Sequence, residues 1–210
     1  MSATTAASAA YIVAALLFIL SLAGLSRHES AKNGNVFGIA GMVIALAATI
    51  GLATQDITAI GITLLVAAMA VGAVIGLWRA RRVEMTGMPE LIAMLHSFVG
   101  LAAVLVGWNG YLSVEAHGDA QNEVPANLLG IHSGEVGIGV FIGAVTLTGS
   151  IVAFLKLSGR IKSNPLMLPG HNWLNLGALV AFVVLTAFFV ASPSLPLLTA
   201  ITVLALALGW

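Results

Sequence analysis

One apolar stretch of the chain, MPELIAMLHSFVG at residues 88–100, carries an ionisable side chain, that of His96. A charged group inside a membrane span costs about 2.5–3.5 kcal/mol or more, so an ionisable residue there is by default a functional hypothesis. Imidazole groups titrate near neutral pH, which suits a proton relay. His96 is therefore the first candidate for chemistry. The alternative is a structural histidine that is hydrogen-bonded between helices.

A second set of polar residues recurs at helical spacing further along the chain. One helical stripe would hold Glu135, Gly139, Thr146 and Ser150. If the two spans are antiparallel, His96 and Ser150 both lie about 10 Å from the same membrane face. We expect Ser150, together with Thr146, to line one polar seam with His96. Glu135 lies nearer the opposite face, where a solvated carboxylate is the alternative.

Small residues accompany these candidates. His96 shares its stripe with Gly100, Ala103, Gly107 and Gly110, and small residues let membrane helices approach closely. This spacing predicts tight helix packing and by itself carries no chemistry. The glycines expected to pack are Gly100, Gly107, Gly139 and Gly143.

The composition indicates the elements that position these residues. The 210 residues are 60% hydrophobic and only 8% charged, whereas a soluble domain carries about 25% charged residues. Long apolar runs without strand alternation predict an all-α polytopic integral membrane protein, a single transmembrane domain over residues 1–210. About seven spans are expected: Ala9–Leu25, Val36–Ala53, Ile57–Trp78, Pro89–Leu112, Asn127–Leu157, Trp173–Ala191 and Leu195–Trp210.

Two of these spans look irregular. The fifth is long, and we expect a break near Gly130 or Gly134. The last span rises only about 22 Å as a helix, which is short of a hydrocarbon core about 30 Å thick. The short last span suggests either an earlier helix start or a natural chain that continues.

The charged residues predict the orientation. All eight basic residues fall in or beside alternate loops: Arg27, Lys32, Arg79, Arg81, Arg82, Lys156, Arg160 and Lys162. The opposite loops hold the acidic residues Asp56, Glu115, Asp119 and Glu123 and contain no Lys or Arg. The positive-inside rule then places the basic loops in the cytoplasm and the N-terminus outside. Trp108 and Tyr111 are expected at the outer interface, and the basic loops 79–90 and 160–171 are candidate contacts for soluble domains.

Several function classes are disfavoured. The chain has no cysteine, which excludes disulfides and thiolate metal sites, and its net charge is zero, so no nucleic-acid partner is expected. GIGVFIG at residues 137–143 lies inside an expected span, so it is no dinucleotide fingerprint. A haem held by two histidines needs both at one depth, but His96 lies toward the inside and His132 toward the outside. A stand-alone helical transporter stays open, although no inverted repeat is evident.

Four segments carry a family resemblance: VFGIAGM, VEMTGMPELIAMLHSFVGLAAVLVGWNGYL, FIGAVTLTGSIVAF and NPLMLPGHNWLN. They resemble the membrane domain of the β subunit of proton-translocating NAD(P) transhydrogenase. The resemblance implies hydride transfer from NADH to NADP⁺ coupled to inward proton movement across a bacterial inner membrane. It also implies that soluble domains outside this chain bind NAD(H) and NADP(H), that α-subunit helices are partners, and that protomers form a homodimer.

The resemblance also assigns residues. The histidine of the family's ELxxxLHSFVG motif is its principal proton-path candidate and corresponds to His96. The serine of its TFTGS-like motif corresponds to Ser150 in TLTGS, and a glutamate of less certain function corresponds to Glu135. The family subunit continues with further spans and an NADP(H) domain. The chain is therefore expected to be a fragment with no cofactor and no catalytic residue of its own.

Overall fold

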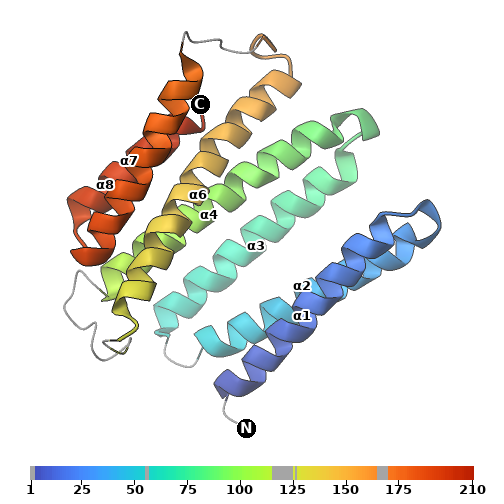
Figure 1. Ribbon diagram of the computed structural model, residues 1–210. Helices are drawn as coiled ribbons and strands as arrows, with labels where there is room; N and C mark the ends of the chain where they lie inside the picture. Colours follow the sequence, from blue (N-terminus) through green and yellow to red (C-terminus); the bar gives the residue numbers. More distant parts are fainter. Residues whose placement is uncertain (1–2, 55–56, 115–124, 126, 165–169) are drawn as a thin grey trace. The chain divides into compact units, whose positions relative to one another are not determined.

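The computed structural model describes residues 3–54, 57–114, 125, 127–164 and 170–210 (Figure 1). These residues form no strand and two single-turn 3₁₀ helices, His28–Ser30 and Met85–Gly87. The seven predicted helices are confirmed: α1 Ala3–Leu25, α2 Ala31–Ala53, α3 Ala59–Arg82, α4 Met88–Val114, α6 Leu129–Leu157, α7 His171–Ala191 and α8 Leu195–Leu208. The chain is therefore an all-α protein, as predicted. The acidic loop residues named above lie outside the described ranges.

Six of these helices are long and apolar enough to cross a membrane. The seventh, α8, has 14 residues and rises about 21 Å, so the expectation of a short last helix is confirmed. The break expected in the fifth span is wrong, because α6 is continuous through Gly130 and Gly134. A helical glycine costs only about 1 kcal/mol relative to alanine. Both glycines face Val190 of α7. A Cβ added at Gly130 or Gly134 would lie 3.9 or 3.7 Å, respectively, from a methyl carbon of Val190, so packing supports the helix there.

The contacts divide the chain into two compact units, Met1–Arg81 and Arg82–Trp210, and each is described by itself. The expected single domain stays a prediction. In the first unit α1 and α2 pair closely at one end, where a Cβ added at Gly24 would lie 2.6 Å from the Cα of Gly34. Nearer the other end, the hydroxyl oxygen of Tyr11 and that of Thr49 are hydrogen-bonded at 3.0 Å. One end of this hairpin is therefore held by close backbone packing at glycine, and the other by a hydrogen bond between side chains.

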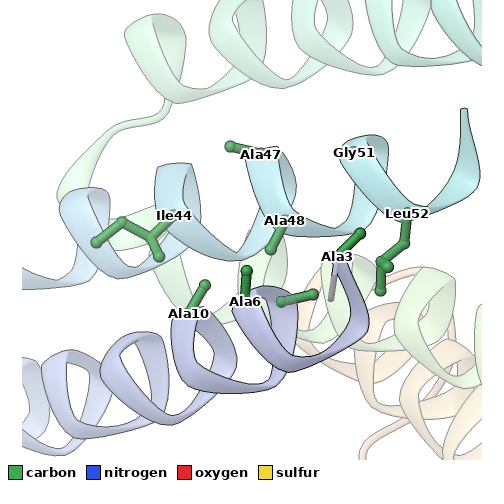
Figure 2. A pocket seen from close by; sticks show the side chains of 9 residues that line it. Ala3, Ala6, Ala10, Ile44, Ala47, Ala48, Gly51 and Leu52 are labelled. Atoms are coloured by element: carbon green, nitrogen blue, oxygen red, sulfur yellow. The ribbon is translucent and has the colours of Figure 1, made fainter. Parts of the chain in front are cut away.

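A groove of about 420 Å³ lies between α1 and α2 (Figure 2). Alanines from both helices line it, with Ile44, Gly51 and Leu52 completing the wall. Side chains this short leave room between paired helices, because they do not fill the space that larger residues would occupy. None of the described residues that line the groove is charged.

The second unit packs around α6, which contacts α4, α7 and α8. Its core consists of six buried residues: Tyr111, Val136, Val140, Phe189, Leu198 and Ile201. The rings of Tyr111 and Phe189 lie 5.7 Å apart, a separation typical of favourable aromatic pairs. This core holds α4 and α6 together and so fixes the helix pair that carries the candidate residues.

Trp108 and Tyr111, which are expected at the outer interface, both contact neighbouring helices. Tyr111 is 5% exposed, and the indole Nε1–H of Trp108 donates a hydrogen bond of 3.1 Å to Oγ1 of Thr202 on α8. Both aromatics therefore pack between helices. Sequence position alone could not reveal this, because Thr202 lies 94 residues away.

We expect Trp108→Phe to lower the free energy of unfolding by about 0.6–1 kcal/mol, the typical strength of an interhelical hydrogen bond in membranes. Thermal unfolding in detergent measures the change. Thr202→Val should cost a similar amount, and the double variant should cost less than the sum of both. A strictly additive double variant would show that the two side chains do not interact.

Candidate functional site

The close contact of α4 with α6 sets the position of every candidate residue (Figure 1). A Cβ added at Gly100 would lie 2.5 Å from the backbone nitrogen of Leu147 and 2.7 Å from the backbone oxygen of Gly143. One added at Gly107 would collide with Val140. Because higher numbers on α4 face lower numbers on α6, the two helices are antiparallel. Their backbones approach so closely because glycine lies at the contact.

The four glycines predicted to pack divide into two kinds. Gly100, Gly107 and Gly143 lie in the contact, and a Cβ added at Gly143 would be 2.9 Å from the Cβ of Ala103. A Cβ added at Gly139 would have no neighbour within 4 Å. Gly139 therefore lies beside the contact, on the wall of an open groove.

The register places His96 and Ser150 at one level of the helix pair. Gly100 faces the segment from Gly143 to Leu147. His96 lies about 6 Å from Gly100 toward the N-terminus of α4. Ser150 lies a similar distance from the facing segment toward the C-terminus of α6, which is the same direction because the helices are antiparallel. The imidazole is exposed, and Ser150 is half-buried. Within the described part of the chain, no hydrogen bond joins the two side chains.

The groove beside the contact has a volume of about 340 Å³. Its lining comes from both helices: Ala103, Val106, Gly107, Gly110, His132, Glu135, Val136 and Gly139. The imidazole Cε1 of His132 would lie 3.6 Å from a Cβ at Gly110. His132 thus turns toward α4 and lines the groove with the exposed Glu135. The sequence indicated both residues but not their shared groove with α4.

Helical spacing connects this groove with the other candidates. Ala103 in the groove wall lies seven residues after His96, which is about two turns along the same side of α4. Gly139, also in the wall, lies seven residues before Thr146 on α6. The ionisable and hydroxyl side chains therefore follow one face of the helix pair. Chemically, such a row could pass a proton through intervening water between groups that accept and release it.

Two neighbouring polar residues have other roles. Thr148, in the centre of the TLTGS segment, donates to the backbone oxygen of Ala144 at 3.1 Å and packs against Gly209 at the end of α8. Ser97, next to His96, is buried and donates to the backbone oxygen of Met94 at 2.7 Å. Both face the interior of the unit, so their hydroxyls satisfy local carbonyls.

The geometry also bears on the alternatives. His132 lies opposite Gly110, which is 14 residues, about 21 Å along the axis, from His96. This separation is too large for two axial ligands of one haem. The described residues contain no group of three or more potential metal ligands. GIGVFIG lies within α6, where helix hydrogen bonds engage the backbone N–H groups that would have to bind a pyrophosphate.

Cysteines introduced at positions 96 and 150 test the shared level. We expect a short bifunctional thiol reagent to cross-link His96→Cys with Ser150→Cys, because both side chains lie on the same face. These 210 residues contain no cysteine, so none of them gives a background reaction. Phe98→Cys with Ser150→Cys is the matched control, since position 98 points to nearly the opposite side of α4. Equal yields from both pairs would contradict the arrangement.

Comparison with known proteins identifies relatives. Residues 7–210 match the family NAD(P) transhydrogenase beta subunit. Two curated relatives, both named NAD(P) transhydrogenase subunit beta, come from Rhodospirillum rubrum, one of them from a specified strain. Each is 42% identical over 205 residues, an alignment that covers 96% of this chain and 42% of the relative. The chain thus spans about two fifths of the length of these relatives.

Proposed function

The chain belongs to the NAD(P) transhydrogenase beta subunit family, and from this we propose that it forms the proton-translocating membrane part of a transhydrogenase. In the proposed reaction, hydride transfer from NADH to NADP⁺ is coupled to inward proton movement. NAD(H) and NADP(H) bind soluble domains of the complex, so this chain supplies no catalytic residue for hydride transfer. The observation that carries the proposal is the row of polar side chains along one face of the α4–α6 pair.

His96 is the proposed proton carrier. A proton binds a nitrogen of its imidazole from one side of the membrane and leaves toward the other side. Ser150 and Thr146 lie on the α6 side of the same face, where their hydroxyls both donate and accept hydrogen bonds and orient water near the ring. Glu135 and His132 line the groove farther along, where they connect the carrier with the opposite end of the pair.

Coupling requires that the imidazole of His96 be accessible from only one side of the membrane at a time. A conformational change in the NADP(H) domain would bias the helix pair between two states, each hydrating the imidazole from a different face. α-subunit membrane helices would cover the exposed face on which His96 lies, and two protomers would form the working dimer. The proposed location is the bacterial plasma membrane, with several spans and with the basic loops in the cytoplasm.

The test uses the complete enzyme that contains this chain, reconstituted in liposomes with its α-side partner. We expect reduction of NADP⁺ by NADH to move protons across the membrane, measured with a pH-sensitive dye. A protonophore should collapse the proton gradient and accelerate hydride transfer. Hydride transfer without proton movement would contradict the proposed role of the chain, and absence of both would contradict its membership of a working transhydrogenase.

A further inference from the structure

The C-terminal end of α8 lies against the part of α6 that contains the TLTGS segment, residues 146–150. Leu198, Ile201 and Ala205 are fully buried and recur at helical spacing along one side of α8. Gly209 follows one turn later on the same side. The side chains therefore shorten along this side from leucine to glycine, which lets the end of α8 approach α6 closely.

The contact at Gly209 reaches the backbone of α6. A Cβ added at Gly209 would lie 2.5 Å from the backbone oxygen of Val145 and 2.9 Å from the backbone nitrogen of Gly149. It would also collide with Oγ1 of Thr148, whose hydroxyl donates to the backbone oxygen of Ala144 at 3.1 Å. The backbones of the two helices therefore meet here, because glycine at position 209 leaves no side chain between them.

The same stretch of α6 is held by α4 on its other side. Gly143 and Leu147 meet Gly100 of α4 through their backbone atoms. Val145 and Gly149, which meet α8, are each two residues further along and so lie roughly 160° around the helix from them. Backbone atoms do not rotate away as side chains do. A displacement of the end of α8 toward α6 must therefore move the backbone of α6.

We infer that Gly209 is a positioning residue for Ser150, because its contact sets the place of α6 relative to α4. Ser150 directly follows Gly149, so a shift of the backbone at Gly149 carries the Ser150 hydroxyl with it. A misplacement of about 1 Å can cost about a hundredfold in a step that depends on geometry. The inference rests on the proposed function, in which this hydroxyl orients water near His96.

Cross-linking measures the position of Ser150 without reference to proton movement. The complete enzyme carries His96→Cys and Ser150→Cys, with or without Gly209→Ala, and mass spectrometry identifies the linked peptides. We expect Gly209→Ala to slow cross-linking by a short bifunctional thiol reagent by about fivefold or more. Gly177→Ala is the matched control, since a Cβ there has no neighbour within 4 Å, and it should leave the rate unchanged. Equal rates with glycine and alanine at position 209 would overturn the inference.

Proton translocation in liposomes tests whether Gly209 acts through Ser150. Gly209→Ala and Ser150→Ala should each slow translocation by about tenfold. The double variant should be no slower than Ser150→Ala, because the hydroxyl that Gly209 positions is already absent. Effects that multiply, as at independent sites, would reduce Gly209 to a packing role and overturn the inference. Slower cross-linking with normal translocation would support the positioning and contradict the proposed role of the Ser150 hydroxyl.

A second variant presses on the same contact from α6. A Cβ added at Gly149 would lie 3.4 Å from the backbone oxygen of Gly209, so the larger side chain of Gly149→Val meets the end of α8. This variant should slow cross-linking in the same way, and it provides the test where the Gly209→Ala enzyme does not assemble. Gly177→Val is its control. An unchanged cross-linking rate in the Gly149→Val enzyme would also overturn the inference.

Discussion

His96→Ala is expected to abolish proton translocation by the assembled enzyme in liposomes. Removal of a group that accepts and releases the proton in each cycle typically costs about a hundredfold or more in rate. Hydride transfer should slow in parallel, because proton translocation and hydride transfer share conformational states in the proposed mechanism. Binding of NADP(H) should stay measurable, since the proposed nucleotide site lies outside this chain. A pH-sensitive dye reports translocation, and absorbance of the reduced nucleotide reports hydride transfer.

Two comparison variants separate a carrier from a structural residue. Phe98→Ala changes an exposed side chain on the other side of α4 and should preserve translocation. Ser150→Ala removes only a hydroxyl that orients water, so it should weaken coupling less than His96→Ala does. Normal translocation by the His96→Ala enzyme would exclude the relay role. An equal defect in Phe98→Ala would indicate that His96 matters through packing.

Gly100→Ala should lower the stability of the second unit by about 1–3 kcal/mol, the usual cost of overpacking. The new methyl group would meet the backbone of Leu147 at 2.5 Å and that of Gly143 at 2.7 Å. Backbone atoms cannot rotate away as side chains do, so the helices must separate. The better helix propensity of alanine recovers only about 0.5–1 kcal/mol. Thermal unfolding in detergent, followed by circular dichroism, measures the loss.

Gly177→Ala is the matched control for this substitution. Gly177 lies in α7, and a Cβ added there has no neighbour within 4 Å. The same chemical change should therefore be neutral or slightly stabilising. If Gly100→Ala unfolds at the same temperature as Gly177→Ala, the close contact between α4 and α6 is absent in the folded protein.

Local patterns were sufficient to predict the helices. Membrane hydrocarbon requires each span to satisfy its own backbone hydrogen bonds, so an apolar run of adequate length already specifies a helix. The observed bounds of α4, Met88–Val114, differ from the predicted span Pro89–Leu112 by only one and two residues. The predicted break in α6 failed because a neighbouring helix, through Val190, packs against the glycines where the break was expected.

The candidate site was only partly predictable. The number of residues between each side chain and the end of its helix predicted that His96 and Ser150 lie at the same level, because the rise per residue is a local property of a helix. Which glycines pack and which line a groove was not predictable: Gly139 and Gly143 lie one turn apart on α6, and only Gly143 meets α4. That difference depends on the angle and separation of two helices.

By itself, the sequence determined that this chain is a bundle of apolar helices with a histidine inside one of them, because hydropathy and helical period act over a few turns. Only the tertiary structure decided the surroundings of individual side chains. It joined Trp108 to Thr202 of α8, turned Thr148 toward Gly209, and placed His132 and Glu135 on one groove with α4. These pairings depend on surfaces brought together from distant parts of the chain, and no local pattern specifies which face of a helix meets which partner.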